Sequence, residues 1–196
     1  MVAQPSPIGM SVEQWRALEQ ISSDIKHEYI DGQVYAMSGG SRNHGQIGSN
    51  AVRLLEDAIG DTCYVYNSDV AARLSPSRYT YPDATVTCDE RDRATDETEV
   101  LAPRVIVEVL SNSTEAYDRG EKWGYYRACP SVQEYVLIAT KYQSVEVYSR
   151  TPPIWTYHAY GPGDEIALAS IGISISFTAL YRRTTVPEPD DRRGEV

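Results

Sequence analysis

The chain of 196 residues is 41% hydrophobic and 23% charged, a composition typical of a globular protein that buries a sizeable core. Its net charge of −10 weighs against a protein that covers nucleic acid with a broad basic surface, although a small basic cleft is compatible with it. No run of 18 apolar residues occurs, so we expect no membrane span.

The three cysteines do not indicate a structural zinc site. Cys63, Cys88 and Cys129 are far apart, and no CxxC motif occurs. The N-terminal stretch MVAQPSPIGM lacks the charged start and apolar core of a signal peptide. An odd number of cysteines without a signal peptide indicates a reducing compartment, so we expect a cytoplasmic location.

A helix is the first predicted element. Residues 1–10 contain two prolines and are expected to be disordered. The stretch SVEQWRALEQ (11–20) predicts a helix, because Ser11 and Gln14 have the spacing of a capping box.

A hairpin and a second helix follow. In HEYIDGQVYAM (27–37), two strand-like runs flank Asp31-Gly32, a dipeptide that favours a type I′ turn. The stretch 41–60 carries apolar residues at helical spacing and ends near a glycine, so it predicts a helix.

The rest of the chain is mostly strands around one further helix. We predict that helix over 113–129 and a short strand with a helical turn over 162–181. The predicted strands cover 63–74, 78–88, 104–110, 132–140, 144–150 and 154–160.

This order of elements predicts an α/β fold with a mixed central β-sheet, flanking helices and an antiparallel extension. We expect one domain over residues 11–183. The acidic stretch 184–196 is expected to be a disordered tail.

Two carboxylates stand where strands normally exclude them. In RYTYPDATVTC (78–88), Pro82 cannot donate to a β-ladder and Asp83 is a poor strand residue. In RVIVEVL (104–110), Glu108 lies between two valines of a strand predicted to be buried. Buried carboxylates repel each other unless a cation or a shared proton holds them together.

A divalent cation accounts for such a pair. Mg²⁺ is commonly held by one or two carboxylates, several waters and substrate phosphates. Asp83 and Glu108 are therefore predicted metal ligands for Mg²⁺, with Mn²⁺ as a substitute. Lys122 lies on the helix after Glu108 and is placed to orient a metal-bound water or stabilise charge on a phosphate. Glu28 offers another carboxylate from the N-terminal region.

At this point the chain resembles a known family. An acid after proline, an acid in the next core strand and a nearby lysine are similar to the layout of the PD-(D/E)XK nuclease superfamily. More narrowly, the chain resembles the Uma-type restriction endonuclease family of bacteria over about residues 11–181. The segments that carry the resemblance are HEYIDGQVYAMSGGSRNHGQIG, YPDATV, VIVEVLSNSTEAYDRGEKWGYYR, PSVQEYVLI and SIGISI.

The resemblance implies site roles and a restriction-endonuclease-like core. Asp83 matches the acid of the PD motif, and Glu108 matches the acid of (D/E)XK. Leu110 stands where that motif has its lysine, which points to Lys122 on the following helix. Glu28 matches the acid of the N-terminal segment.

Three more residues are weaker candidates for the site. His44 matches a family histidine. Asp69 is another acid in a strand-like run. Arg119 could touch phosphate from the predicted helix, although a solvated helix face explains it equally well.

The leading hypothesis is a Mg²⁺-dependent endonuclease that hydrolyses DNA phosphodiester bonds, with a homodimer implied by the family. A second hypothesis is a catalytically silent protein that keeps the fold as a binding or assembly module, which the net charge of −10 favours. A third is a sugar hydrolase with paired carboxylates, but it leaves Lys122 without a role.

Overall fold

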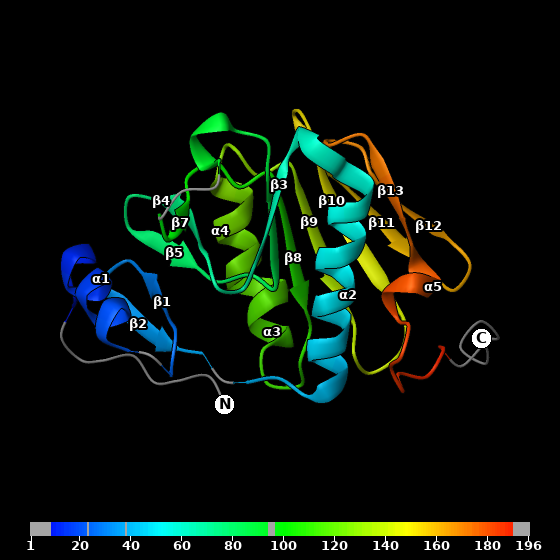
Figure 1. Cartoon of the computed structure of the whole chain (residues 1–196), viewed down its shortest axis with the longest axis horizontal. Coiled ribbons are helices and arrows are strands. Elements are labelled where there is room, and N and C mark those ends of the chain that lie inside the picture. The colour runs from blue at the N-terminus through cyan, green and yellow to red at the C-terminus, as the bar shows by residue number, and fades with distance from the viewer. Residues whose placement is uncertain (1–8, 23, 38, 94–96, 190–196) are drawn as a thin grey trace.

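A six-stranded mixed sheet forms the centre of the molecule (Figure 1). The computed structural model describes residues 9–22, 24–37, 39–93 and 97–189. Within the sheet the strand order is β11-β10-β9-β8-β6-β3; β8 and β9 run parallel and the other neighbours run antiparallel. The strands are β3 (Tyr64–Asn67), β6 (Ala84–Thr87), β8 (Val105–Val109), β9 (Glu134–Ile138), β10 (Val145–Thr151) and β11 (Ile154–Tyr160).

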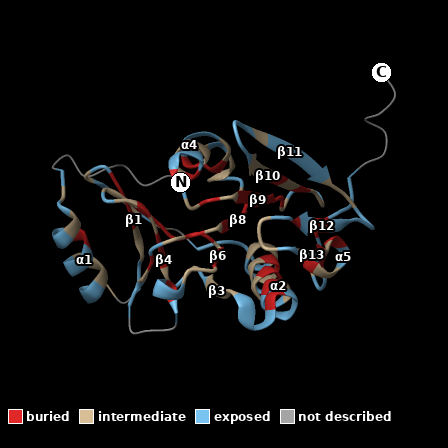
Figure 2. Ribbon diagram, turned by 90° about the horizontal axis from the view of Figure 1, so that it is seen from above, coloured by how far each residue is buried: buried red, intermediate tan, exposed pale blue. Residues whose placement is uncertain are grey.

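Helices cover both faces of this sheet (Figures 1 and 2). Helix α2 (Arg42–Ile59) lies on one face. The other face is covered by α3 (Glu115–Tyr117), a π-helical segment (Asp118–Lys122) and α4 (Trp123–Ala128). The expected α/β fold, with its mixed sheet between helices, is confirmed.

The alternation of side chains along β8 decides where Glu108 points. Val105, Val107 and Val109 join the core cluster that includes α2. Ile106 joins the cluster on the α4 side. Glu108 shares the face of Ile106, so its carboxylate meets the helical segment that carries Lys122.

A second, five-stranded sheet lies beside the first, in the order β2-β1-β5-β4-β7. The predicted hairpin is confirmed, and both turn residues have positive φ (Asp31 49°, Gly32 92°), as a type I′ turn requires. The predicted capping box of the first helix is present. The elements are α1 (Val12–Ile21), β1 (His27–Ile30), β2 (Gln33–Ala36), β4 (Ala71–Ser75), β5 (Arg78–Thr80) and β7 (Glu99–Val100).

Two of the predicted strands are wrong as single strands. The stretch 63–74 splits into β3 and β4, and the stretch 78–88 splits into β5 and β6. In both cases the two halves belong to different sheets. Pro82, which cannot donate to a ladder, lies in the link where the chain leaves one sheet and enters the other. No strand therefore has to accept the Pro-Asp pair.

The C-terminal elements close the α2 side of the core. Strands β12 (Glu165–Leu168) and β13 (Ile173–Ser176) form a hairpin, followed by α5 (Phe177–Leu180). Beyond them Val186 is buried and Thr185 hydrogen-bonds to Asn43. The packed chain thus continues past the boundary expected at residue 183, because an apolar side chain there completes the core. Residues 190–196 of the expected tail, and residues 1–8, lie outside the described residues.

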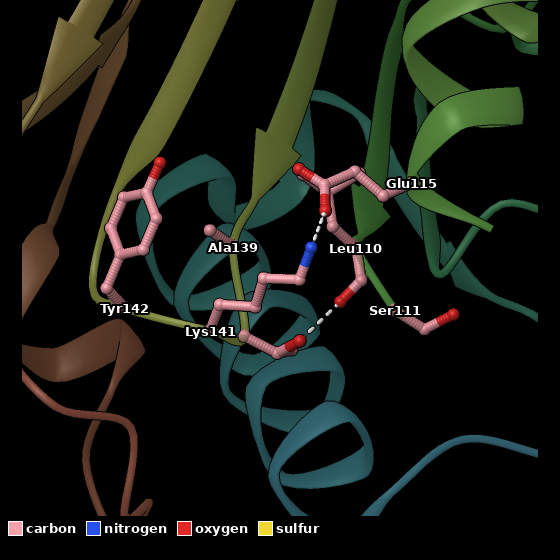
Figure 3. Close-up of a pocket in the computed structure, with 7 residues that line it drawn as sticks. Leu110, Ser111, Glu115, Ala139, Lys141 and Tyr142 are labelled. Carbon is pink, nitrogen blue, oxygen red and sulfur yellow. Dashed lines mark hydrogen bonds and ion pairs between the residues drawn. The ribbon is translucent and has the colours of Figure 1, made fainter. Parts of the chain in front are cut away.

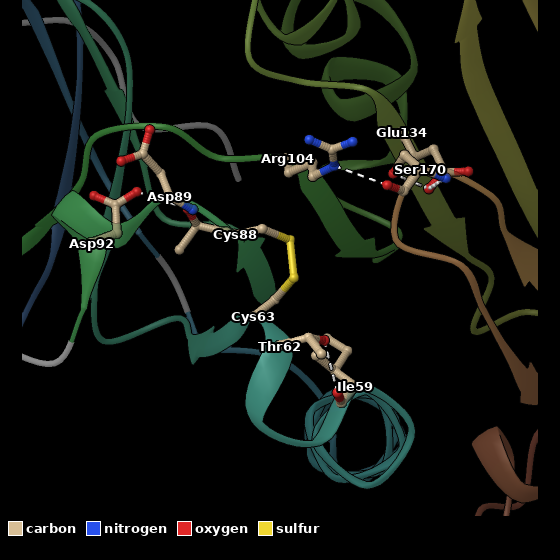
Figure 4. Close-up of a disulfide and its surroundings, with 10 residues drawn as sticks. Ile59, Thr62, Cys63, Cys88, Asp89, Asp92, Arg104, Glu134 and Ser170 are labelled. Atoms are coloured by element: carbon tan, nitrogen blue, oxygen red, sulfur yellow. Dashed lines mark hydrogen bonds between the residues drawn. A yellow bond between two sulfur atoms is a disulfide. The ribbon is translucent and has the colours of Figure 1, made fainter.

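A disulfide joins the large sheet at its β3 edge (Figure 4). Cys63 and Cys88 flank the antiparallel pair of β3 with β6, where Tyr64 lies opposite Thr87. The bond therefore links direct cross-strand neighbours. Short 3₁₀ turns adjoin both cysteines, η1 (Gly60–Thr62) and η2 (Glu90–Asp92). Cys129 is buried with a free thiol.

Among the helices of the described residues, none has the length and apolar character needed to cross a bilayer.

Candidate active site

The predicted site residues meet where the two sheets join. Asp83 follows β5 of the small sheet and precedes β6 of the large one. Its Oδ2 accepts a hydrogen bond of 2.7 Å from the backbone N–H of Val109. The Pro-Asp link is thereby fastened to the end of β8, next to Glu108.

Glu108 is buried, and Lys122 and Tyr126 both bind the same oxygen of its carboxylate. Oε1 is 2.9 Å from Nζ of Lys122 and accepts a hydrogen bond of 2.6 Å from the Tyr126 hydroxyl. The same hydroxyl lies 3.3 Å from Oγ1 of Thr80 in the small sheet. Tyr126 therefore positions the carboxylate against both sheets.

Lys122 is the cation at the centre of the cluster. Its side chain is only 6% exposed. Besides Glu108, its Nζ lies 2.8 Å from Oε1 of Glu28 and 3.8 Å from Oδ1 of Asp118. The π-helical segment brings Asp118 and Lys122 to the same buried side, and such segments are frequent at functional sites.

Glu28 reaches the cluster from β1. Its Oε1 also accepts from the backbone N–H of Tyr81, at 3.2 Å. The residue therefore spans from Lys122 to the link that carries Asp83. This contact braces the lysine against the Pro-Asp link.

His44 approaches from the opposite face, in the first turn of α2. Its Nε2 lies 3.5 Å from Oδ2 of Asp83. The Ser41 side chain accepts from the His44 backbone N–H and fixes the start of the helix. A Cβ on Gly40 would lie 2.6 Å from the Cγ of the imidazole, so the glycine leaves the ring its place.

Electrostatics at the site are dominated by crowded acids. Burial raises the pKa of Glu108 to about 8, although Lys122 pulls it down. Burial likewise raises the pKa of Asp83 and of Asp118. Burial alone would lower the pKa of Lys122, but Glu108, Glu28 and Asp118 together raise it well above its ordinary value. The lysine is charged, and these three acids surround it.

This donor set fits a hard divalent cation. Within the described ranges, no three His, Cys, Asp or Glu side chains form a ready-made metal cage. Mg²⁺ seldom uses such a cage, and one or two carboxylates with waters and phosphates suffice. Asp83 and Glu108 supply two carboxylates from neighbouring positions, since the backbone N–H of Val109, the residue after Glu108, donates a hydrogen bond to Asp83.

Two of the weaker candidates do not join the cluster. Asp69 lies in an exposed ion pair with Lys26 in the turn between β3 and β4. Arg119 makes a two-pronged ion pair with Glu146, with both N–O distances 2.8 Å. Both side chains instead stabilise neighbouring elements.

The structure adds residues that pattern reasoning missed. Asp118 looks like an ordinary helix-surface acid in its sequence context, and Tyr126 like a core aromatic. Their common signal is spacing, because Asp118, Lys122 and Tyr126 recur every four residues. Of these three residues, Lys122 and Tyr126 bind Glu108, and Asp118 pairs with Lys122.

A small hollow lies at the ends of the parallel strands β8 and β9, with a volume of about 10 Å³ (Figure 3). It has room for about one water. Thr140 donates to the backbone oxygen of Leu110 across it, at 2.6 Å, and Lys141 pairs with Glu115. The Thr140–Leu110 hydrogen bond links the two strand ends, and the hollow is too small for a substrate.

Comparison with known proteins assigns the family. The Uma2 family model, described as "Putative restriction endonuclease", matches residues 12–179, most of the chain.

The chain belongs to the Uma2 family.

Two relatives resemble the chain along most of their length. The uncharacterized protein slr1290 of Synechocystis sp. is 40% identical over 160 residues, which cover 80% of this chain and 84% of the relative. The uncharacterized protein sll1609 of the same organism is 36% identical over 154 residues, covering 76% and 85%.

A solved structure shares the Uma2 fold. A protein from Anabaena variabilis, described as a putative nuclease belonging to DUF820, aligns with a TM-score of 0.70. The alignment covers 88% of this chain and 97% of that one at 17% identity. The likeness shows the fold, and the expected nuclease-like architecture is confirmed.

Proposed function

We propose that this Uma2 protein is a metal-dependent endonuclease that hydrolyses phosphodiester bonds in DNA. One observation carries the proposal: Glu28 of β1, Asp83 of the Pro-Asp link, Glu108 of β8 and Lys122 of the π-helical segment converge on one cluster where the two sheets meet. The fold alone does not require buried carboxylates around a single lysine, since such a cluster is costly to bury.

Each residue of the cluster has a role that follows from its contacts. Asp83 and Glu108, with a backbone carbonyl beside Glu108, would hold Mg²⁺ or Mn²⁺. When bound, the metal would lower the pKa of a coordinated water and neutralise charge on the phosphate. Lys122 has three donors, and two meet Glu28 and Glu108. The third is available to orient water or stabilise phosphate charge, while Glu28 holds the lysine in place.

The test is cleavage of supercoiled plasmid DNA with and without Mg²⁺. We expect metal-dependent nicking or linearisation by the native protein. Asp83→Asn and Glu108→Gln, which keep the side-chain size, should each reduce the rate by roughly 10³-fold or more. Asp69→Asn is the matched control, because Asp69 is an acid outside the cluster. Equal rates in the native protein and both site variants would contradict the proposal.

The second candidate is a binding or assembly module without catalysis. The net charge of −10 favours it, since a DNA enzyme needs a basic path to its substrate. The same assay separates the two, because a module cleaves no DNA with either metal.

The family resemblance also motivates a homodimer, in which two copies would cut the two DNA strands. Sedimentation of the purified protein with and without DNA would test this. A cytoplasmic location stays a prediction, and the Cys63–Cys88 disulfide is of a kind that persists mainly in oxidising compartments.

A further inference from the structure

The hydroxyl of Tyr117 is buried and has no hydrogen-bond partner among the described residues. A tyrosine hydroxyl in such surroundings normally finds a partner, because leaving it unpaired is costly. Thr85 has the other buried hydroxyl without a partner in the part of the chain that the structure describes, but it lies on β6, inside the sheet between β3 and β8. Tyr117 instead lies beside the candidate active site, with its ring near Lys122.

Its place follows from the π-helical segment. Tyr117 immediately precedes that segment, and Lys122 ends it. Hydrogen bonding of the i→i+5 type brings residues five apart onto one side. The Tyr117 ring accordingly lies with its centroid 5.8 Å from Nζ of Lys122.

The β1–β2 hairpin encloses the ring from the other side. The ring centroids of Tyr35 and Tyr117 are 6.4 Å apart. Tyr35 is the cross-strand partner of Glu28, whose carboxylate binds Lys122. The elements that hold Glu28 and Lys122 thus also hold the phenol.

The phenol is available as a donor. Burial, followed by the negative charge of Glu28, raises the pKa of Tyr117. The proton therefore stays on the oxygen at neutral pH, and an incoming anion beside Lys122 can accept it.

We propose that Tyr117 donates a hydrogen bond to an oxyanion that docks beside Lys122. On the proposed function, which this inference extends, the oxyanion is a non-bridging oxygen of the scissile phosphate. A neutral donor fixed next to a buried ammonium stabilises charge as it develops there. Tyr117 would then contact the substrate, whereas Tyr126 binds Glu108 and positions that proposed metal ligand.

The experiment compares Tyr117→Phe with Tyr35→Phe. The Tyr35 hydroxyl bonds to Gln33 on the surface, so its variant removes a phenolic oxygen from the same aromatic pair without touching the orphan donor. One arm measures kcat and KM for DNA cleavage in Mg²⁺. The second arm measures the rise in Tm caused by inorganic phosphate with Mg²⁺, which requires no cleavage.

For Tyr117→Phe we expect kcat to fall by roughly 10²-fold with KM little changed. Its Tm without ligand should not fall, because no hydrogen bond is lost, and the phosphate-induced rise should disappear. Tyr35→Phe should retain native kcat and the native phosphate effect. Loss of kcat together with a lowered ligand-free Tm would assign Tyr117 a structural role and overturn the inference.

The two arms separate this inference from the proposed function. If the native protein cleaves no DNA but phosphate still raises its Tm through Tyr117, the nuclease proposal fails and the oxyanion contact stands. If phosphate has no effect on the native protein, or the same effect on Tyr117→Phe, the oxyanion contact is wrong whatever the nuclease assay gives.

Discussion

Glu108 lies on strand β8, whose other side chains are all buried. The carboxylate has an ammonium and a phenol on one oxygen, yet burial still raises its pKa to about 8. A buried carboxylate with a raised pKa is costly in a hydrophobic core but typical of a functional site. Substituting Glu108 therefore tests the electrostatics of the cluster directly.

The first prediction concerns stability against pH in metal-free buffer. The folded protein binds the Glu108 proton more tightly than the unfolded chain, since its pKa rises from 4.5 to about 8. Glu108 therefore adds stability below its ordinary pKa, and this is lost as pH rises through about 8. The loss is on the order of a few kcal/mol, at ~1.4 kcal/mol per pKa unit.

Urea unfolding in EDTA, at about pH 5 and about pH 8, checks this. Glu108→Gln has no proton to lose, so the difference in unfolding free energy between the two pH values should shrink. An unchanged difference would show that other groups cause it.

Lys122 is predicted to be the most sensitive charged residue for stability. Lys122→Met removes the cation and leaves Glu28, Glu108 and Asp118 uncompensated. Breaking a buried ion pair by deleting one partner costs ~3–5 kcal/mol. The loss should be larger at about pH 8 than at about pH 5, where the acids can take up protons.

The matched control is Lys141→Met. Lys141 pairs with Glu115, but its side chain is 55% exposed. Exposed ion pairs contribute ~0–1 kcal/mol. Comparable losses of unfolding free energy in the two variants would contradict the central position assigned to Lys122.

At the scale of elements, the site depends on how the first turn of α2 meets the Pro-Asp link. We predict that Gly40→Ala moves the His44 ring away from Asp83, because the new Cβ would lie 2.6 Å from the ring. If His44 serves cleavage, Gly40→Ala should lower activity as His44→Ala does, by roughly 10²-fold. The double variant should be no worse than either one.

Gly39→Ala is the control, since its Cβ would meet nothing within 4 Å. Plasmid cleavage by the four variants and the native protein is the measurement. Full activity in Gly40→Ala would show that cleavage does not need the His44 ring beside Asp83.

The disulfide gives a second prediction at this scale. Thiol titration of the denatured protein should find the one free cysteine, Cys129, before reduction and all three afterwards. The bond closes a loop of 25 residues, so Cys88→Ser should cost ~3 kcal/mol of stability. A reducing agent should destabilise the native protein by a similar amount and leave Cys88→Ser unchanged. Three reactive thiols before reduction would rule the bond out.

Local signals explain which elements could be predicted from the sequence. Asp31-Gly32 and the Ser11–Gln14 box determine their own backbone geometry, so the hairpin and first helix follow from the residues. The split at Pro82 could not be predicted in full. The proline marks a break between strands, but no residue near it indicates that the next strand belongs to another sheet. Cys63 and Cys88 became neighbours only through that pairing.

The same distinction applies to the site. Asp83 and Glu108 stand out because a carboxylate contradicts its apolar surroundings. Asp118, Tyr117 and Tyr126 do not stand out, since acids and tyrosines are ordinary in a helix. Their roles depend on the π-helical segment and on two sheets meeting, which are properties of the fold.

For the molecule as a whole, a strongly acidic chain encloses a cluster in which three acids surround one lysine. The two sheets share no strand, and the link through Asp83 joins them at this cluster. A bound divalent cation would therefore reduce repulsion where the sheets meet. Folding stability and metal binding should be coupled in this protein.

The most direct test of that claim is calorimetric titration with Mg²⁺ and Mn²⁺ of the native protein, Asp83→Asn, Glu108→Gln and the control Asp69→Asn. We predict saturable binding to the native protein and to Asp69→Asn, and none to either site variant. Binding that persists in Asp83→Asn and Glu108→Gln would contradict a shared metal site between these two carboxylates.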